Sequence, residues 1–392
     1  MEIRRVAIGF GAMLTACVFV PLALLTGCSA GSTSGTQAGA TTGIGAGQSG
    51  DPQSPGSGRI PSRPGQAAVS LSETGSTLLY PLFADWASAY HREFRNVAFT
   101  TAATGSGTGI ADASAGAADI GASDAFLSSG NLVANPALLN IPLAIAGQQV
   151  NYNLPQLGPR GHVRLNGAVL ARMYRGQIKT WNDRAIARLN PGVSLPAIKV
   201  VPLHRAESSG DTFLFSSYLS TGDPLWNSAI GYGTTVAWPH AAGARAEEGN
   251  GGMLTGCAAT PGCVAYIGIS YLSQALKAGL GEAALQNAAG QFTLPTGASL
   301  RAAVSTFVPA TPANETISMI NGPARAGYPI VNYEYAIVAT RQPSAAKARA
   351  VKAFLHWAIT AGNSARYLDR VRFEPLPAAV VSLADAQIAR IR

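Results

Sequence analysis

Residues 69–90 read VSLSETGSTLLYPLFADWASAY, and this stretch combines a strand, a turn and a helix. The segment 69–71 is typical of a β-strand, and 73–75 (Glu-Thr-Gly) is typical of a turn. From Thr77 to Tyr90, apolar residues recur every four positions, which predicts a helix with one buried face. A strand, a Gly/Ser/Thr turn and a helix start together form a unit typical of α/β proteins.

The same unit occurs twice more, and strands and helices alternate along the chain. The turn Gly105-Ser106-Gly107-Thr108-Gly109 follows a β-like segment at 97–101 and opens a predicted helix through residue 117. The turn Ser208-Ser209-Gly210-Asp211 follows a predicted strand at 199–203. The other predicted elements are strands at 120–122 and 330–338 and helices at 212–219 and 345–360. This alternation predicts α/β layers with mainly parallel sheets, and the chain length favours two lobes.

The composition limits the classes of function. The chain has 392 residues, of which 47% are apolar, enough for sizeable buried cores. Only 12% are charged, which argues against a coiled coil and against a conventional disordered chain. The formal charge of +8 is spread without a basic run, so nucleic-acid binding is disfavoured and a small anionic ligand fits better.

The N-terminus has the pattern of an export signal. Two arginines precede a largely apolar stretch from Val6 to Leu25, which is the order found in secretory signals. The stretch is also long enough for a membrane-spanning helix. Leu25-Thr26-Gly27-Cys28, however, resembles the bacterial lipoprotein box. That resemblance implies that residues 1–27 are a signal peptide and that Cys28 carries the lipid, including palmitate.

Residues 28–66 are expected to form a flexible tether. Of the 38 residues from 29 to 66, 25 are Gly, Ser, Thr or Pro and none is aromatic. Such a segment buries too little apolar surface to offset the entropy of ordering. No later apolar run is long enough to span a bilayer. We therefore expect an exported body, lipid-anchored to the outer face of the cytoplasmic membrane.

Cys257 and Cys263 remain once the predicted signal and Cys28 are set aside. They flank a short turn with Gly and Pro. Two nearby thiols in an exported chain are expected to form a local disulfide. A metal site is a poor interpretation because the five histidines are scattered, so neither a metal nor a cofactor is predicted.

The three Gly/Ser/Thr turns indicate a site for a tetrahedral oxyanion. Each would place a helix N-terminus, with unpaired N–H groups and the positive end of a dipole, at the edge of a sheet. Three such ends together, beside Arg205, could hold an anion. The alternatives are that each Ser or Thr only caps its helix, and that Arg205 only pairs with a carboxylate such as Glu207.

Asp124 and Asp211 fit an anion site only if the anion carries a proton. An ionised carboxylate repels an anion but accepts a hydrogen bond from a P–OH group. Hydrogen phosphate carries such a proton near neutral pH, whereas sulfate does not. A desolvated aspartate would therefore select against sulfate.

Four motifs in order resemble the phosphate-binding protein of the Pst ABC importer, the PstS family. The motifs are Glu73-Thr74-Gly75-Ser76-Thr77-Leu78, Gly105-Ser106-Gly107, Gly121-Ala122-Ser123-Asp124 and Arg205-Ala206-Glu207-Ser208-Ser209-Gly210-Asp211-Thr212. The resemblance extends across the chain from Val69, and the lipoprotein box and cysteine-bearing turn are similar to those of lipid-anchored actinobacterial members. It implies a two-lobed periplasmic-binding-protein fold of type II, with the ligand in the hinge cleft.

The resemblance implies phosphate-binding roles in the first lobe. Ser76, Thr77 and Leu78 would supply backbone and hydroxyl donors. Leu78 stands where many members have Phe, so its N–H is the expected contact. Ser106 would donate from the second helix start, and Asp124 would accept the phosphate proton.

The second lobe would complete the phosphate site. Arg205 would clamp the oxyanion, and Ser209 and Gly210 would close the site. Asp211 departs from the family pattern, in which Thr is common. It is interpreted either as a second acceptor or as a helix cap.

The resemblance also implies a domain organisation and partners. Lobe I would be discontinuous, with residues 67–150 plus 325–392, and lobe II would be 151–324. Lobe closure over phosphate would present a closed shape to the importer's permease subunits. A monomer without a nucleic-acid partner is expected.

Two other classes of function remain as alternatives. Phosphatases also hold phosphate, but from residue 67 onward the chain has no Gly-x-Ser-x-Gly elbow, no P-loop Gly-Lys pair and no clustered His/Asp set. His204 adjoins Arg205 and is interpreted as a packed strand residue rather than a general base. A surface lipoprotein could also be an adhesin. We predict that the protein is not an enzyme.

Overall fold

The computed structural model describes residues 60–158 and 161–392. The predicted signal peptide, Cys28 and the tether up to residue 59 lie outside these residues. The end of the predicted tether contacts the folded body, since the Asn96 amide donates to the carbonyl oxygens of Gly65 and Ala67. Among the described residues, no helix is both long and apolar enough to cross a membrane.

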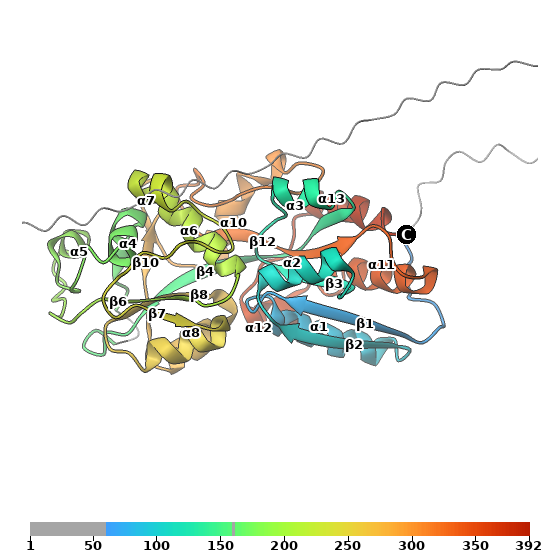
Figure 1. Cartoon of the computed structure of the whole chain (residues 1–392), viewed down its shortest axis with the longest axis horizontal. Coiled ribbons are helices and arrows are strands. Elements are labelled where there is room, and N and C mark those ends of the chain that lie inside the picture. Colours follow the sequence, from blue (N-terminus) through green and yellow to red (C-terminus); the bar gives the residue numbers. More distant parts are fainter. Residues whose placement is uncertain (1–59, 159–160) are drawn as a thin grey trace, which may run out of the picture. The chain divides into compact units, whose positions relative to one another are not determined.

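Strands within the described residues form one large sheet and one small sheet. In the large sheet nine strands run in the order β2-β1-β3-β12-β4-β8-β6-β7, with β9 paired to β4, and β11-β10-β5 form the small one. In Figure 1, β1 and β2 lie at one end and β6 and β7 at the other. The strands are β1 Val69–Gly75, β2 Val97–Ala103, β3 Ile120–Ser123, β4 Leu138–Tyr152, β5 Arg164–Leu165, β6 Val201–Arg205, β7 Arg245–Glu247, β8 Cys263–Gly268, β9 Gly281–Glu282, β10 Ala284–Gln286, β11 Phe292–Thr293 and β12 Val331–Ala339.

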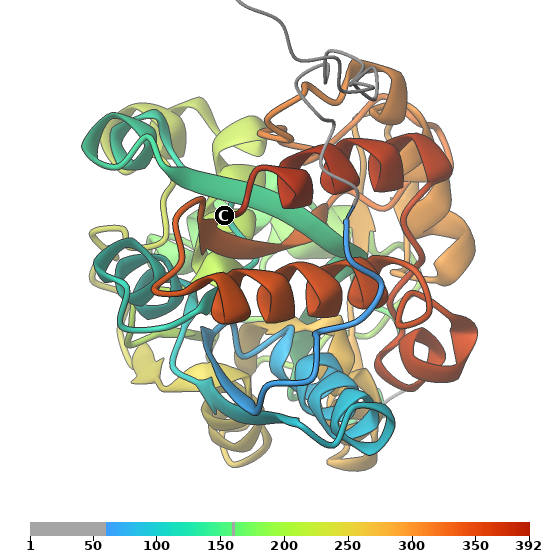
Figure 2. The ribbon, with the colours of Figure 1, turned by 90° about the vertical axis from the view of Figure 1, so that its right-hand side faces the viewer.

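Helices pack against the sheets. Helix α11 contacts β1 and β4, and α13 contacts both α11 and β4 (Figure 2). The helices are α1 Tyr80–Glu93, α2 Ser106–Ala115, α3 Ser129–Ala134, α4 Gly167–Tyr174, α5 Arg184–Leu189, α6 Gly210–Gly222, α7 Pro224–Ala229, α8 Gly249–Ala258, α9 Leu272–Lys277, α10 Gly297–Ser305, α11 Ala345–Ile359, α12 Ala365–Val371 and α13 Ala378–Ala389, with 3-10 turns η1 Ile269–Tyr271 and η2 Val308–Ala310.

The α/β fold and the predicted helices and strands are confirmed, although the ends of most of them differ by a few residues. The turn predicted at 73–75 is wrong, because these residues are the end of β1. The predicted buried face of α1 is also correct. Its fully buried side chains include Leu82, Trp86 and Tyr90.

The expectation of mainly parallel sheets is wrong at the centre of the large sheet. β12 pairs antiparallel with both β3 and β4, and β4 pairs antiparallel with β8. Strand–helix alternation predicts parallel neighbours only where consecutive strands lie side by side, and β4 and β12 are far apart in sequence. The largely apolar run 138–146 is the signal for β4, because a strand buried on both faces lacks alternation.

β4 links the two halves of the large sheet. Up to Gly147 it pairs with β12, and from Gln148 onward it pairs with β8. Strands β1, β2, β3 and β12 lie on one side of this change of partner, and β6, β7 and β8 lie on the other. The ends of β1, β3 and β6 carry the residues described next.

Candidate functional site

Ser76 closes a tight turn between β1 and α1. Its Oγ accepts hydrogen bonds from the N–H groups of Leu78 (3.1 Å) and Leu79 (3.0 Å). Helix α1 therefore begins at Tyr80, and residues 77–79 form a separate turn rather than the first helical turn. The Leu78 N–H, the expected contact for a ligand, already has a partner within the protein.

Asp124 lies directly after β3 and is almost completely buried. Ser76 Oγ donates to Asp124 Oδ1, and Ser106 Oγ donates to Oδ2 at 3.4 Å. The Asp124 N–H in turn donates to Ser106 Oγ at 3.2 Å. Two sequence-predicted serines from two different turns are thus brought together around the predicted Asp124 carboxylate.

Gly210, the first residue of α6, approaches this carboxylate from the other half of the sheet. A Cβ placed on Gly210 would lie 2.6 Å from both Asp124 Cβ and Ser106 Oγ. No side chain fits in that space, so glycine is required there for the two halves to meet.

Arg205 ends β6 and is the central cation of the site. Its side chain is only 1% exposed and forms ion pairs with Asp211 (Nη1 to Oδ2, 2.6 Å) and with Glu207. Its Nη2 also donates to Thr77 Oγ1 at 3.1 Å. The Glu207 ion pair, one of the alternatives for Arg205, is therefore present alongside contacts with two other predicted site residues.

Asn250 and Gln148 complete the hydrogen bonding and were not predicted from the sequence. The Asn250 amide donates to Thr77 Oγ1 (2.8 Å) and to Asp211 Oδ2 (2.7 Å). The Gln148 amide donates to Asp211 Oδ1 at 2.9 Å. A fourth Gly-rich turn, Glu248-Gly249-Asn250-Gly251-Gly252, is the sequence signal for Asn250. Gln148 has no local signal, because the register of β4 positions it.

Asp211 has three donors from the protein, namely Arg205, Asn250 and Gln148. Helix α6 is preceded by Ser209 as its N-cap residue, and within the described structure no side chain caps it. The capping interpretation of Asp211 therefore has no support in the structure.

Ser209 contributes a buried hydroxyl. The residue is 1% exposed, and its Oγ has no hydrogen-bond partner among the residues described. Its N–H donates to Thr234 O at 2.8 Å. A buried hydroxyl with no partner is costly, so this group is available to a ligand.

Burial governs the charge state of the carboxyls. Burial raises the pKa of Asp124, the charge of Asp211 raises it further, and Ser76 and Arg205 lower it. Burial also raises the pKa of Asp211, and the Arg205 guanidinium opposes that shift. Each negative charge is thus retained only where donors compensate for lost water.

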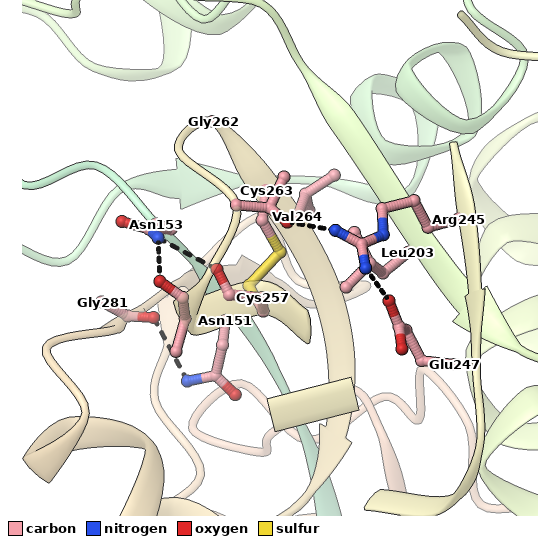
Figure 3. The surroundings of a disulfide bond; sticks show 12 residues. Asn151, Asn153, Leu203, Arg245, Glu247, Cys257, Gly262, Cys263, Val264 and Gly281 are labelled. Atoms are coloured by element: carbon pink, nitrogen blue, oxygen red, sulfur yellow. Dashed lines mark hydrogen bonds and ion pairs between the residues drawn. A yellow bond between two sulfur atoms is a disulfide. The ribbon is translucent and has the colours of Figure 1, made fainter. Parts of the chain in front are cut away.

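The predicted disulfide between Cys257 and Cys263 is present (Figure 3). It joins the C-terminal end of α8 to the start of β8. The Asn153 amide donates to the carbonyl oxygens of Cys257 and Ala258, each at 2.9 Å. These bonds fix one end of the helix whose first turn carries Asn250.

His204 packs as a strand residue. Its ring stacks on Trp238 with centroids 5.0 Å apart, and its Nδ1 lies 3.1 Å from Arg205 O. In the described part of the chain, no group of three or more His, Cys, Asp or Glu residues is arranged to hold a metal ion.

A groove of about 610 Å³ opens beside the site. It is bordered by Gly107 and Phe126 from one half and by Ser208 and Phe213 from the other. Gly107 and Ser208 touch directly, since the Gly107 N–H donates to Ser208 O at 3.1 Å.

Comparisons with known proteins agree with this fold. Residues 38–361 match the model of the PBP superfamily domain. Two solved structures share the fold. A phosphate-binding protein from Stenotrophomonas maltophilia has TM-score 0.61 and 20% identity, covering 81% of this chain and 94% of that one. A substrate-binding protein from Clostridium perfringens has TM-score 0.56 and 15% identity, covering 79% and 100%.

Relatives with higher identity extend over most of the chain. Phosphate-binding protein PstS of Xylella fastidiosa is 33% identical over 326 residues, 83% of this chain and 86% of the relative. PstS of Methanocaldococcus jannaschii is 30% identical over 379 residues, covering 91% and 89%. PstS 3 of Mycobacterium leprae is 30% identical over 306 residues, covering 75% and 80%.

A mixed sheet crossed by β4, with a polar site where its two halves meet, defines a periplasmic-type solute-binding protein of type II. Within that class, the chain belongs to the PstS family of phosphate-binding proteins.

Proposed function

We propose that this chain is a high-affinity extracytoplasmic receptor that binds inorganic phosphate and delivers it to an ABC importer. The observation that carries the proposal is the buried Arg205 guanidinium, which contacts two carboxylates that follow β6 and the Thr77 hydroxyl that follows β1. Relatives that are 30% identical or more are named phosphate-binding proteins. The proposed ligand residues are Ser76, Thr77, Leu78, Ser106, Asp124, Arg205, Ser209, Gly210 and Asp211.

The acceptors in the site suit phosphate better than sulfate. A carboxylate such as Asp124 accepts a hydrogen bond from a P–OH group, and sulfate offers no such donor near neutral pH. Arg205 supplies charge-assisted donors to an oxyanion. The closeness of Gly210 to Asp124 fits a site that excludes water when its halves meet, which strengthens every polar contact inside it.

The proposed lobes are 67–150 plus 325–392 and 151–324. The change of partner along β4, between Gly147 and Gln148, supports a crossing near 148–151. The second crossing, near 325–329, directly precedes β12. Closure about these two segments would bring Gly210 against Asp124.

The N-terminal assignments are also part of the proposal. Residues 1–27 would be the signal peptide, and Cys28 would carry the lipid at the outer face of the cytoplasmic membrane. Residues 28–66 would be the tether, with its last residues against the body. The mature protein would act as a monomer that docks on the permease subunits.

Phosphate uptake in cells without their own receptor tests delivery. Expression of this chain should restore uptake, and Arg205→Met should abolish it. Cys28→Ala should reduce uptake while the purified protein still binds phosphate. Restored uptake by Arg205→Met would contradict the assignment of the site.

A phosphatase is the competing function, and turnover of p-nitrophenyl phosphate distinguishes it. We expect tight binding of phosphate and no turnover of the ester. Turnover of the ester by the wild type that is lost in Arg205→Met would show that the protein is an enzyme and would contradict the proposed receptor function.

A further inference from the structure

Glu334, in the middle of β12, is a fully buried acid in an unusual environment. Neither of its carboxyl oxygens accepts a hydrogen bond from any residue that the structure describes. An ionised carboxyl in such a place is costly. The Glu334 carboxyl group is therefore expected to be protonated and neutral, and in that form it can donate a hydrogen bond.

The register of the sheet places Glu334 beside Asp124. β12 pairs antiparallel with β3, and the pairing ends at Tyr335 and Ser123. Glu334 and Asp124 are the next residues at that end, where β12 has an irregularity in its pairing with β4. Side chains alternate along a strand, and Asn332, two residues before Glu334, donates from its amide to Asp124 O. The strand pairing and the Asn332 contact therefore place the Glu334 and Asp124 side chains close to each other.

Two adjacent carboxyls in a dry site share one proton, because two neighbouring negative charges repel. The surrounding donors decide which group holds it. Ser76 Oγ and Ser106 Oγ donate to Asp124 and stabilise its ionised form. Burial raises the pKa of Glu334 well above its usual value, and the charge of Asp124 raises it further. The proton therefore belongs to Glu334.

We propose that Glu334 is a positioning residue that acts through Asp124. Its protonated carboxyl donates a hydrogen bond to the Asp124 carboxylate from the β12 side and holds it ionised and oriented as an acceptor. This inference rests on the proposed function and specifies its substrate, since an ionised Asp124 requires a phosphate species that carries a proton.

Rising pH should remove the hydrogen bond that Glu334 donates to Asp124. Asp211 on α6 faces the pair and repels it, and Arg205 on β6 attracts the Asp124 charge. Tyr335, next on β12, has a pKa raised by burial and stays a neutral phenol. When Glu334 loses its proton, Asp124 loses a donor and gains an adjacent negative charge. Phosphate affinity should then fall more steeply than the ionisation of phosphate alone requires.

Calorimetric titration of the purified protein with inorganic phosphate, from pH 5.5 to pH 9, tests the proposal. Glu334→Gln keeps a donor but has no titratable proton, so its affinity should stay within about threefold of wild type at pH 7 and decline less at alkaline pH. Glu334→Leu removes the donor and should weaken binding about 10-fold or more at pH 7.

Glu315→Gln is the matched control, because Glu315 is also fully buried with unpartnered carboxyl oxygens among the described residues. It should leave the pH profile of binding unchanged. A Glu334→Gln profile identical to wild type, or wild-type affinity in Glu334→Leu, would overturn the inference alone. Absence of phosphate binding by the wild type would overturn the proposed function instead. Thermal unfolding of each variant confirms that it is folded.

Discussion

The guanidinium of Arg205 and the carboxylate of Asp211 form a buried ion pair, with Nη1 2.6 Å from Oδ2 and both side chains at most 1% exposed. Asp211 therefore has a structural task, since it compensates for the charge of the residue expected to clamp the oxyanion. Thr77 accepts from Arg205 Nη2 and links this pair to the turn after β1. One cation thus connects the two halves of the sheet.

Replacing Arg205 by Met should remove phosphate binding and destabilise the fold. The change leaves Asp211 without its ion-pair partner, and breaking a buried pair costs about 3–5 kcal/mol. Phosphate titration and urea unfolding measure both effects. Arg245→Met is the control, since Arg245 pairs with Glu247 but its side chain is 50% exposed, and it should alter stability by at most about 1 kcal/mol. Equal effects of the two variants would contradict the central role of Arg205.

Replacing Asp124 by Asn should weaken phosphate binding about 10- to 100-fold and relax the rejection of sulfate. The amide can donate to an unprotonated oxyanion, which the carboxylate cannot. Competition between phosphate and sulfate in the variant measures the change. Undetectable sulfate binding in Asp124→Asn would show that acceptance of a proton is an incomplete account of selectivity.

Replacing Asp211 by Thr should shift the pH at which phosphate binds best. The change removes a negative charge that raises the pKa of Asp124, so the Asp124 carboxylate should persist to lower pH in the variant. Affinity measured between pH 5 and pH 8 should therefore decline less on acidification than in the wild type. If the pH dependence of phosphate affinity is unchanged in Asp211→Thr, the role of Asp211 is restricted to its ion pair with Arg205.

Replacing Gly210 by Ala should prevent closure without unfolding the protein. The new Cβ would lie 2.6 Å from Asp124 Cβ and Ser106 Oγ, closer than side chains pack, so the halves must separate. Phosphate affinity should fall about 100-fold or more, since closure orders the donors. Gly251→Ala is the control, because a Cβ there meets no atom of the described residues within 4 Å. Tight phosphate binding by Gly210→Ala would contradict the proposal that closure of the site requires Gly210 to lie against Asp124.

Replacing Glu315 by Gln should flatten the pH dependence of stability. Burial raises the pKa of Glu315 from 4.5 to about 9, so the folded protein keeps a proton that the unfolded chain releases. The resulting stability is fully present below pH 4.5 and is lost as the pH rises toward 9. At pH 8 the free energy of unfolding of the variant should exceed that of the wild type by at least about 2 kcal/mol, and at pH 4.5 the two should differ little.

Urea unfolding at pH 4.5, 6.5 and 8 measures this difference. Glu248→Gln is the control, because Glu248 is exposed. Parallel pH profiles for Glu315→Gln and wild type would show that Glu315 does not hold its proton in the folded state.

The parts of the site that follow local motifs could be predicted from the sequence. Ser76, Ser106, Asp124 and Arg205 each stand at a strand end or a Gly/Ser/Thr turn, and the structure brings them together. The start of α1 was misplaced because the Ser76 hydroxyl holds an extra turn, a side-chain effect that apolar periodicity does not report.

The remaining partners depend on strand register and on contacts between distant segments. Gln148 reaches the site through the pairing of β4 with β8, and Glu334 through the pairing of β12 with β3. No local pattern encodes these pairings. Asn250 reaches Thr77 and Asp211 through the placement of α8. Periodicity identifies helices and strands, whereas contacts between side chains from separate elements follow from tertiary packing.

Calorimetric titration tests whether the site selects phosphate. The purified wild-type protein, refolded to remove bound ligand, is titrated with phosphate and then with sulfate at two pH values. We expect tight one-to-one binding of phosphate and no detectable binding of sulfate. Equal binding of both anions, or of neither, would contradict a site in which Arg205 holds an oxyanion and Asp124 selects the one that carries a proton.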